Sequence, residues 1–381
     1  MDRIGYLAHD LADPAVARRV RMFGMGGAEV ALAGFLRGAV LPDLPPAGAA
    51  LVLGRSADAR LARRALGVAR VLATGLGGLA AHLDGADALV ARNLEMLVIA
   101  RALQAQMGGR PRLVYECLDI HRLLTDAGAA GRALRGVEAR LARHVDLLLT
   151  SSPAFVRHHL GRNFPPDRIR IVENKVLTEG PFAPPPPPPP GPPFRIGWFG
   201  ALRCRRSFDL LSALAARLEG RVEVVLRGRP ATTVFPDLAA EAARHPHLRY
   251  GGAYGAADLP ALYGSVHFSW CIDFYEDGQN SAWLLPNRLY ESAAHLAVPI
   301  ALAEVETGRF LQQHGLGLVI RRHNLDSLVA LIAAMTPDRH AALRAAIAAT
   351  PPALWRAGPE EARALVAAVM GRTSDAWTGA A

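Results

Sequence analysis

Short apolar segments alternate with amphipathic segments along almost the whole chain, and this alternation limits the fold more than any other feature of the sequence. The apolar segments have the length of strands and carry few polar residues on either face. Such strands, with helices between them, indicate a parallel sheet covered on both faces. In the first half the predicted strands are Arg3–His9, Ala50–Gly54, Ala86–Arg92, Arg112–Leu118, Asp146–Ser152 and Arg168–Glu173. The predicted helices of this half include Gly27–Leu36, Asn93–Met107 and Arg132–His144.

The second half repeats this plan after a run of prolines at 184–193. Its predicted strands are Phe194–Phe199, Val222–Leu226, Leu248–Tyr250, His267–Ile272 and Pro299–Ala303, with helices such as Phe208–Leu218 and Pro286–Ala297 between them. The proline run predicts an extended, semi-rigid linker, because polyproline forms no internal hydrogen bonds. The alternative is a plain spacer between independent domains.

We therefore predict an α/β chain with two Rossmann-like, doubly wound domains facing across a cleft. The predicted parts are a Rossmann-like domain at 1–180, a proline-rich linker at 181–193, a second Rossmann-like domain at 194–350 and a helical tail at 351–381. Ligands of such sheets bind at the carboxyl ends of the strands. The cleft is accordingly the predicted ligand site.

Composition and charge restrict the class of protein further. The 381 residues are 51% hydrophobic and 20% charged, as in a globular protein with a sizeable core. We expect no membrane-spanning helix and no signal peptide, which predicts a cytoplasmic protein. Three distant cysteines predict neither disulfides nor a cysteine zinc site.

The formal net charge of the chain is +9. Residues 1–180 carry 24 basic and 17 acidic residues, so this half alone has a net charge of +7. A basic half can meet anionic lipid or phosphorylated substrates, whereas no basic run interleaved with aromatic residues indicates nucleic-acid binding.

The glycines at 24–27 form the first candidate motif. A dinucleotide fingerprint would require a third glycine at position 29, which is Glu29, so NAD binding is disfavoured. If a helix begins here, Gly26 and Gly27 would let an anion approach its free N–H groups. A flexible loop explains the glycines equally well.

The second-half motifs point to a nucleoside diphosphate. Gly200 ends a predicted strand, and Arg203 and Arg206 come just before the next helix. Guanidinium groups in this position can bind a diphosphate through charge-assisted hydrogen bonds, although a solvated basic turn has the same composition. Glu291 follows Pro286 on a predicted helix and could accept hydrogen bonds from two ribose hydroxyls, although ordinary helix capping would also explain it.

Asp119 and His121 end a predicted strand of the first half, where each could act as acid, base or sugar ligand. A structural role is the alternative. No motif of a serine hydrolase, a P-loop ATPase or a zinc protease is present in the sequence.

Together these motifs resemble the GT-B glycosyltransferases, in particular the retaining, family 4-like group that builds bacterial polysaccharides and lipopolysaccharide. The resemblance covers nearly the whole chain and rests on Gly26–Glu29, Gly200 with Arg203, Arg206 and Ser207, Asp258–Tyr263, Pro286–Glu291 and Val298–Pro299. Trp283 stands where the group often has a first glutamate, which leaves the donor sugar open. Tyr115–His121 and Ser151–Phe155 are similar to exopolysaccharide transferases of the succinoglycan type.

The resemblance implies transfer of a sugar from a UDP- or GDP-sugar, with retention and without an obligatory metal or a cofactor. Arg203 and Arg206 would stabilise the leaving diphosphate, and Asp119 and His121 would meet the transferred sugar. The expected donor-binding residues are Gly26, Gly27, Gly200, Arg227, Asn287 and Glu291.

The expected acceptor is a saccharide linked to a polyprenyl diphosphate. A loop at His9–Met25, with Arg18, Arg19 and Arg21, would bind it at an anionic membrane surface, where the protein would be peripheral. A solvated loop is the alternative.

Two other functions stay open. A nucleotide-sugar epimerase on the same fold would convert its donor without an acceptor. A non-catalytic two-lobed binding protein would usually be exported, and we see no signal peptide. An NAD oxidoreductase ranks lower because its fingerprint is broken.

Overall fold

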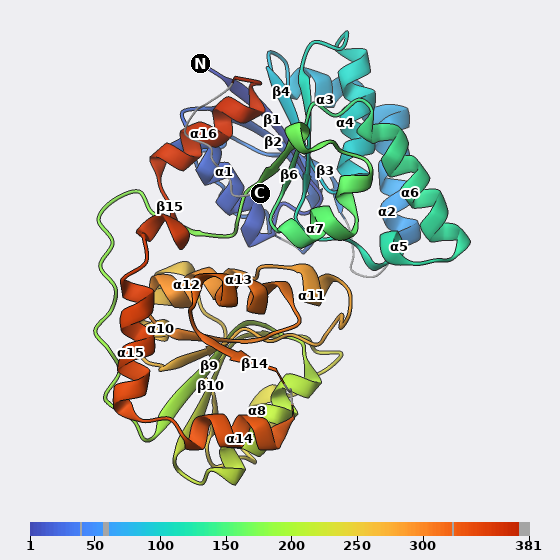
Figure 1. Cartoon of the computed structure of the whole chain (residues 1–381). Coiled ribbons are helices and arrows are strands. Elements are labelled where there is room, and N and C mark those ends of the chain that lie inside the picture. The colour runs from blue at the N-terminus through green and yellow to red at the C-terminus, as the bar shows by residue number, and fades with distance from the viewer. Residues whose placement is uncertain (39, 56–60, 322–323, 373–381) are drawn as a thin grey trace. The chain divides into compact units, whose positions relative to one another are not determined.

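The computed structural model describes residues 1–38, 40–55, 61–321 and 324–372. They form two compact α/β units, each built around its own parallel sheet (Figure 1). Unit 1 comprises Met1–Glu173, Leu177–Glu179 and the C-terminal residues from Ala357, and unit 2 comprises Asn174–Val176 and Gly180–Arg356. This agrees with the predicted fold class of two parallel-sheet domains.

The sheet of unit 1 has seven parallel strands in the order β3-β2-β1-β4-β5-β6-β7. Their bounds are β1 Arg3–Ala8, β2 Glu29–Leu36, β3 Leu51–Arg55, β4 Ala88–Arg92, β5 Arg112–Cys117, β6 Leu147–Thr150 and β7 Ile169–Ile171. Ile4 of β1 pairs with Val30 on one side and with Ala88 on the other. The order of the strands therefore reverses between β1 and β4, which is where ligands of open α/β sheets bind.

The prediction of a helix at Gly27–Leu36 is wrong, because β2 occupies this segment. Its alanine and leucine content favours a helix, but seven of the eight residues are buried, as in a strand covered on both faces. Helix α1, Pro14–Met25, lies instead where we expected a loop. Asp13 caps it by accepting from the Ala15 N–H, and Pro14 occupies its first turn.

Helices on both faces of this sheet complete unit 1. They are α2 Leu61–Arg70, a π-helical turn η1 at Val71–Gly75, α3 Leu76–His82, α4 Leu94–Gln106, α5 Arg122–Thr125, α6 Ala129–Ala142, α7 Pro153–His158 and α16 Pro359–Val369. The last of these comes from the C-terminal end of the chain and packs against α1. The segment predicted as a helical tail thus contributes to the core of unit 1 through Ala362, Leu365, Val366 and Val369.

Unit 2 contains a six-stranded parallel sheet in the order β11-β10-β9-β12-β13-β14. The strands are β9 Phe194–Leu202, β10 Val222–Pro230, β11 Leu248–Tyr250, β12 Phe268–Trp270, β13 Val298–Leu302 and β14 Leu318–Ile320. The helices are α8 Arg205–Arg217, α9 Leu238–Ala242, α10 Leu259–Gly264, α11 Asn280–Trp283, α12 Asn287–Ala294, α13 Glu306–His314, α14 Leu325–Ala333 and α15 Pro337–Ala348. Here the strand order reverses between β9 and β12.

The proline segment is part of unit 2, whereas the sequence predicted a linker between domains. The Arg344 guanidinium donates to the Pro185 carbonyl at 3.1 Å, and His267 Nε2 lies 3.0 Å from the Pro189 carbonyl. These contacts hold the segment on the surface of unit 2. The chain passes between the units at 173–180 and again at 356–357, where β8 (Val176–Leu177) pairs with β15 (Arg356–Ala357).

Candidate active site

The arginines predicted to bind a diphosphate lie at the strand-order reversal of unit 2. Arg203 follows the carboxyl end of β9, and its guanidinium lies 3.3 Å from a carboxylate oxygen of Asp273, which follows β12. Arg206 is in the first turn of α8 and lies 3.6 Å from Asp277. Both side chains remain partly exposed, at 34% and 45%. Their positions suit binding of an anion at this edge of the sheet.

Aromatic rings orient both guanidinium groups. Arg203 lies 4.7 Å from the ring centre of Tyr275, and Arg206 lies 4.1 Å from that of Phe274. Such cation–π contacts add about 0.5–1 kcal/mol at exposed sites. The carboxylates and rings therefore hold two cations at this edge before any ligand arrives.

Gly200 lies near the carboxyl end of β9, with φ of 109°. A side chain there would be strained, and a Cβ at this position would have the Tyr254 hydroxyl as its nearest neighbour, at 3.9 Å. Glycine thus leaves room for a ligand to approach the backbone at the strand end.

Glu291 lies on α12, and its Oε2 accepts a hydrogen bond of 3.0 Å from the Tyr263 hydroxyl. Burial raises the pKa values of Tyr263 and Tyr254, and the charge of Glu291 raises both further. A carboxylate held in one orientation by a neutral tyrosine can accept hydrogen bonds from ligand hydroxyls.

Two further residues expected to bind the donor are located as follows. Arg227 on β10 donates to the carbonyl oxygens of Gly252 and Ala253 at 3.1 and 3.0 Å, so it fixes the turn before Tyr254. Asn287 is the first residue of α12 and is exposed. Tyr254 is the common neighbour of Gly200, Arg227 and Glu291, so these three candidates lie around one side chain. Arg203 and Arg206 follow the carboxyl end of β9, and Asn287 begins α12.

Asp119 and His121 follow β5 in unit 1 and are exposed, as expected for the carboxyl end of a strand. His121 caps α5, because its Nδ1 accepts a 3.3 Å hydrogen bond from the Leu123 N–H. Burial raises the pKa of the half-buried Glu95 carboxyl, and a positive charge on His121 would lower it, so His121 lies near the start of α4, which follows β4.

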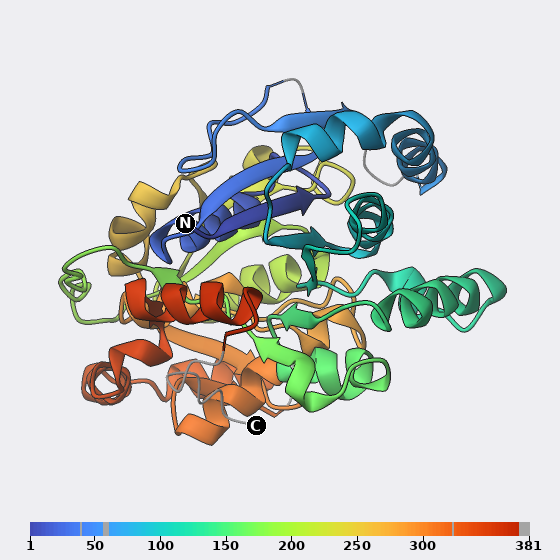
Figure 2. The ribbon, with the colours of Figure 1, turned by 90° about the horizontal axis from the view of Figure 1, so that it is seen from above.

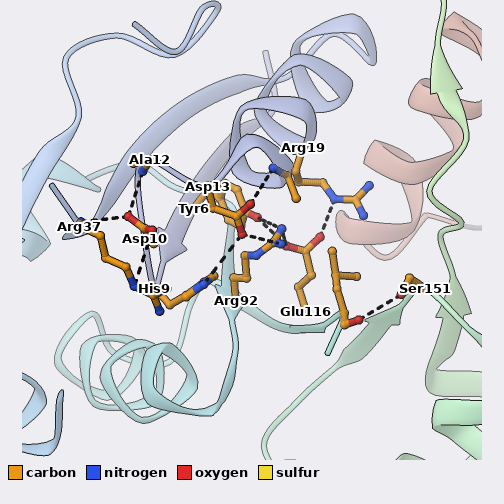
Figure 3. A network of polar contacts seen from close by, with 12 residues as sticks. Tyr6, His9, Asp10, Ala12, Asp13, Arg19, Arg37, Arg92, Glu116 and Ser151 are labelled. Carbon is orange, nitrogen blue, oxygen red and sulfur yellow. Dashed lines mark hydrogen bonds and ion pairs between the residues drawn. The ribbon is translucent and has the colours of Figure 1, made fainter. Parts of the chain in front are cut away.

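A buried network of charges lies at the strand-order reversal of unit 1 (Figure 3). Glu116 of β5 is fully buried and accepts hydrogen bonds of 2.5 Å from the Tyr6 hydroxyl and from Arg19 Nε. Arg92 lies 3.4 Å from the same carboxylate and 3.1 Å from Asp13. The network joins the ends of β1, β4 and β5 to α1, and the sequence analysis missed Tyr6, Arg92 and Glu116. The charged residue inside each apolar strand was the signal that could have found the last two.

His9 lies next to this network and lines a small cavity at the carboxyl edge of the sheet. Burial, then the charges of Arg92 and Arg37, lower the pKa of His9 to about 3, so the imidazole is neutral at physiological pH. Its Nδ1 is buried and has no hydrogen-bond partner among the described residues. The cavity is lined by His9, Phe35, Arg55, Arg64, Gly67, Val68 and Glu95. Two arginines, a neutral imidazole and a carboxyl can bind a polar, anionic ligand.

The structure does not support the anion site that we expected at Gly26 and Gly27. These glycines end helix α1 instead of beginning a helix, and their N–H groups donate to the carbonyl oxygens of Met22 and Gly24. A Cβ on Gly26 would lie 2.5 Å from the Ala362 carbonyl oxygen of α16, so this glycine permits close packing of two helices.

The expected acceptor loop with Arg18, Arg19 and Arg21 is also a helix, α1. Arg19 is 6% exposed and is bound to Glu116, so it cannot meet a membrane surface without breaking a buried ion pair. Arg18 is half-buried and donates to the Glu173 carbonyl, and Arg21 is exposed.

No protein-family model matches the chain. Several solved structures share its fold. HepE of Anabaena, solved with UDP and with UDP-glucose, is 15% identical and superposes with a TM-score of 0.67 over 97% of this chain and 100% of its own. The lipopolysaccharide galactosyltransferase WaaB is 14% identical, with a TM-score of 0.62 over 91% of this chain and 94% of its own. The lipopolysaccharide glycosyltransferase WaaG is 13% identical, with a TM-score of 0.60 over 95% and 99%.

The two parallel-sheet units thus have the GT-B fold of these solved glycosyltransferases. A curated relative then narrows this class: the succinoglycan biosynthesis protein ExoL of Rhizobium meliloti (strain 1021) is 44% identical over 96% of this chain and 93% of its own length. The chain belongs to the ExoL family, which confirms the resemblance to exopolysaccharide transferases.

Proposed function

We propose that the protein transfers a sugar from a UDP-sugar to a growing, lipid-linked saccharide during exopolysaccharide assembly. The observation that carries the proposal is the pair of partly exposed arginines, Arg203 and Arg206, at the strand-order reversal of unit 2, with Glu291 on the helix of the same edge. The complexes of HepE with UDP and UDP-glucose support UDP as the nucleotide.

The chemistry requires cations at the diphosphate, because negative charge grows on it as the glycosidic bond breaks. Arg203 and Arg206 would supply that charge by exchanging part of their contact with Asp273 and Asp277 for the phosphate oxygens. Loss of one such contact should raise the barrier by about 3 kcal/mol. Glu291, held by Tyr263, would accept hydrogen bonds from the ribose hydroxyls.

The acceptor part of the proposal concerns unit 1. Arg55 and Arg64 give the cavity beside His9 the charge needed for an anionic acceptor, such as one that carries a diphosphate. Asp119 and His121, at the end of β5, would meet the transferred sugar. Retention at the anomeric carbon and independence from metal belong to the same proposal and follow the resemblance to the retaining group.

Two measurements test the proposal, namely the binding of nucleotides and the rate of sugar transfer. UDP should raise the melting temperature of the protein more than GDP or ADP does, with or without magnesium, and Arg206→Ala should abolish this shift. With a donor that supports transfer, Arg206→Ala should lower the rate about 100-fold. Arg217→Ala is the matched control, because Arg217 lies on the same helix and is 61% exposed.

No response to any nucleotide would contradict the proposal. Conversion of the donor sugar without an acceptor would favour the epimerase alternative. A proton NMR assignment of the anomeric configuration of the product would test retention.

A further inference from the structure

One helical segment of unit 1 has an apolar surface that the protein does not cover. Residues Arg64–His82, which comprise most of α2 with η1 and α3, are long and apolar enough to cross a membrane by length and composition alone. Only 11% of the residues in this apolar stretch are buried, whereas the core helix of a globular protein is mostly buried. Leu66 is 70% exposed, and Ala65, Ala69, Ala73 and Ala81 are exposed as well. We name this surface the α2–α3 face.

Contacts with the rest of unit 1 hold this segment flat, which disfavours insertion across a membrane. Arg64 lies 3.8 Å from Glu95 of α4 at one end, and His82 Nε2 lies 3.0 Å from the Leu32 carbonyl of β2 at the other. Between these ends α2, η1 and α3 all pack on α4. In both views the segment lies along the outer side of unit 1 (Figures 1 and 2).

The charges of this segment have one sign. Residues 61–82 include Arg63, Arg64 and Arg70 but no aspartate or glutamate. Arg70 is exposed and lies in the same helical stretch as Leu66 and Ala73. An apolar helix face with an exposed arginine, Arg70, and no carboxylate of its own is complementary to an anionic lipid surface, where apolar side chains enter the interface and cations remain among the headgroups.

The same segment forms one wall of the cavity beside His9. Arg64, Gly67 and Val68 of α2 line the cavity, and Arg55 and His9 line its other sides. The α2 residues among them lie on the side of the helix opposite Leu66 and Ala69, so the cavity is separated from the α2–α3 face by one helix diameter, roughly 10 Å. The headgroup of a ligand anchored in a bilayer beneath this face would have to extend over that distance to reach the cationic residues.

We propose that the α2–α3 face docks unit 1 on an anionic bilayer and thereby holds the cavity beside His9 about one helix diameter from the lipid surface, within reach of the headgroup of a lipid-anchored acceptor. The docking itself depends only on this face, and its link to the acceptor rests on the proposed function. This face replaces the arginines of α1 as the membrane-binding part of the chain, because Arg19 is buried in the network around Glu116.

The test is co-sedimentation of the full chain with vesicles of phosphatidylcholine containing about one third phosphatidylglycerol, and with pure phosphatidylcholine vesicles. We expect binding to the anionic vesicles, weakened by high salt. The double variant Leu66→Glu/Ala69→Glu should bind at least about tenfold more weakly, and Arg70→Gln about fivefold more weakly.

Matched controls lie on α6 of the same unit. Val137 is 42% exposed, and Ala133 and Arg140 are exposed as well, so Ala133→Glu/Val137→Glu and Arg140→Gln make the same changes of charge away from the α2–α3 face. Both should bind vesicles as the wild type does. Circular dichroism should show that every variant is folded.

Equal binding of wild type and Leu66→Glu/Ala69→Glu, or no binding of wild type, would overturn the proposal. A wild-type dimer in sedimentation velocity that this double variant abolishes would overturn it too, because the face would then belong to a second copy. UDP binding is measured in parallel: vesicle binding without UDP binding would refute the proposed function and leave the docking proposal standing.

Discussion

At the scale of single residues, Glu116 shows how a charge inside a strand organises a site. The carboxylate is fully buried, which alone would raise its pKa, but Arg19 and Arg92 with the Tyr6 hydroxyl lower the pKa below its ordinary value. Breaking a buried ion pair by removing one partner costs about 3–5 kcal/mol, because the remaining charge stays buried and unpaired. The network thus fixes the strand ends on which the cavity depends.

Glu116→Gln should therefore lower the free energy of unfolding of unit 1 by about 3–5 kcal/mol. The variant leaves Arg19 and Arg92 without their shared carboxylate. Chemical denaturation followed by hydrogen exchange in unit 1 measures the loss. Glu29→Gln is the control, since Glu29 is 53% exposed and pairs with Arg3 at the surface, where a pair contributes at most about 1 kcal/mol. Equal effects of the two substitutions would contradict the argument.

At this scale the sequence predicted the positions of the candidate residues in unit 2 better than those in unit 1. Arg203, Arg206 and Glu291 could be placed near a strand end or a helix start because the local pattern marks these points, whereas their roles stay predictions. The network of Tyr6, Arg92 and Glu116 could not, because its members are up to 110 positions apart and meet only when β1, β4 and β5 align. The spacing of residues along the sequence does not predict which distant strands align.

At the scale of elements, the errors share one physical cause. Strand β2 consists largely of residues that also favour helices, and only its burial between β1 and β3 decides its conformation. Once β2 was predicted to be a helix, the segment before it was predicted to be a loop, and α1 with its Asp13 cap was missed. The repeated strand–helix pattern nevertheless predicted the class of both sheets, since that inference depends on many segments.

The proline segment is a second element whose role depends on contacts far along the chain. His267 is buried, its Nδ1 accepts from the Arg195 N–H at 2.9 Å, and its Nε2 faces the Pro189 carbonyl. Burial first, and then the charges of His340 and Arg195, lower the pKa of His267 to about 4. The histidine therefore holds the segment in its neutral form.

Acid should weaken this attachment. The unfolded state takes up the proton below about pH 6.5 and the folded state only near pH 4, so the contribution of His267 to stability is complete above pH 6.5 and is lost as the pH falls towards 4. Between these values it contributes a slope of about 1 kcal/mol per pH unit to the unfolding of unit 2. Urea titrations at pH 5 and 7, followed through the buried Trp198 and Trp270, measure the slope.

His267→Gln should remove this part of the pH dependence, because the amide keeps one donor and one acceptor but does not titrate in this range. His314→Gln, on the exposed side of α13, should leave the slope as it is in the wild type. An unchanged slope in His267→Gln would show that another group causes the acid sensitivity.

At the scale of the whole molecule, the chain returns to unit 1 after completing unit 2. Helix α16 buries Ala362, Leu365, Val366 and Val369 in the same core as Val20 and Phe23 of α1. The residues proposed to bind the nucleoside diphosphate of the donor all lie in unit 2, whereas the cavity and the network around Glu116 lie in unit 1. The two functions can therefore be separated by removing one end of the chain.

Ending the chain at Ala357 should abolish cooperative unfolding of unit 1, because α16 is lost with two buried alanines and with the buried Leu365, Val366 and Val369, which contribute roughly 1.5–3 kcal/mol each. Unit 2 should keep its tryptophan-reported unfolding transition and its shift with UDP, while vesicle binding should be lost with the fold of unit 1. A chain ending at Arg372 retains α16 and is the control, and both unfolding transitions should be preserved in it.

If the shorter chain kept unit 1 folded, α16 would not be needed for the stability of unit 1, and the close approach of the helices at Gly26 would have no role in that stability. If it instead lost UDP binding while the unit 2 transition survived, the donor site would require residues of unit 1, and the assignment of the donor to unit 2 alone would fall.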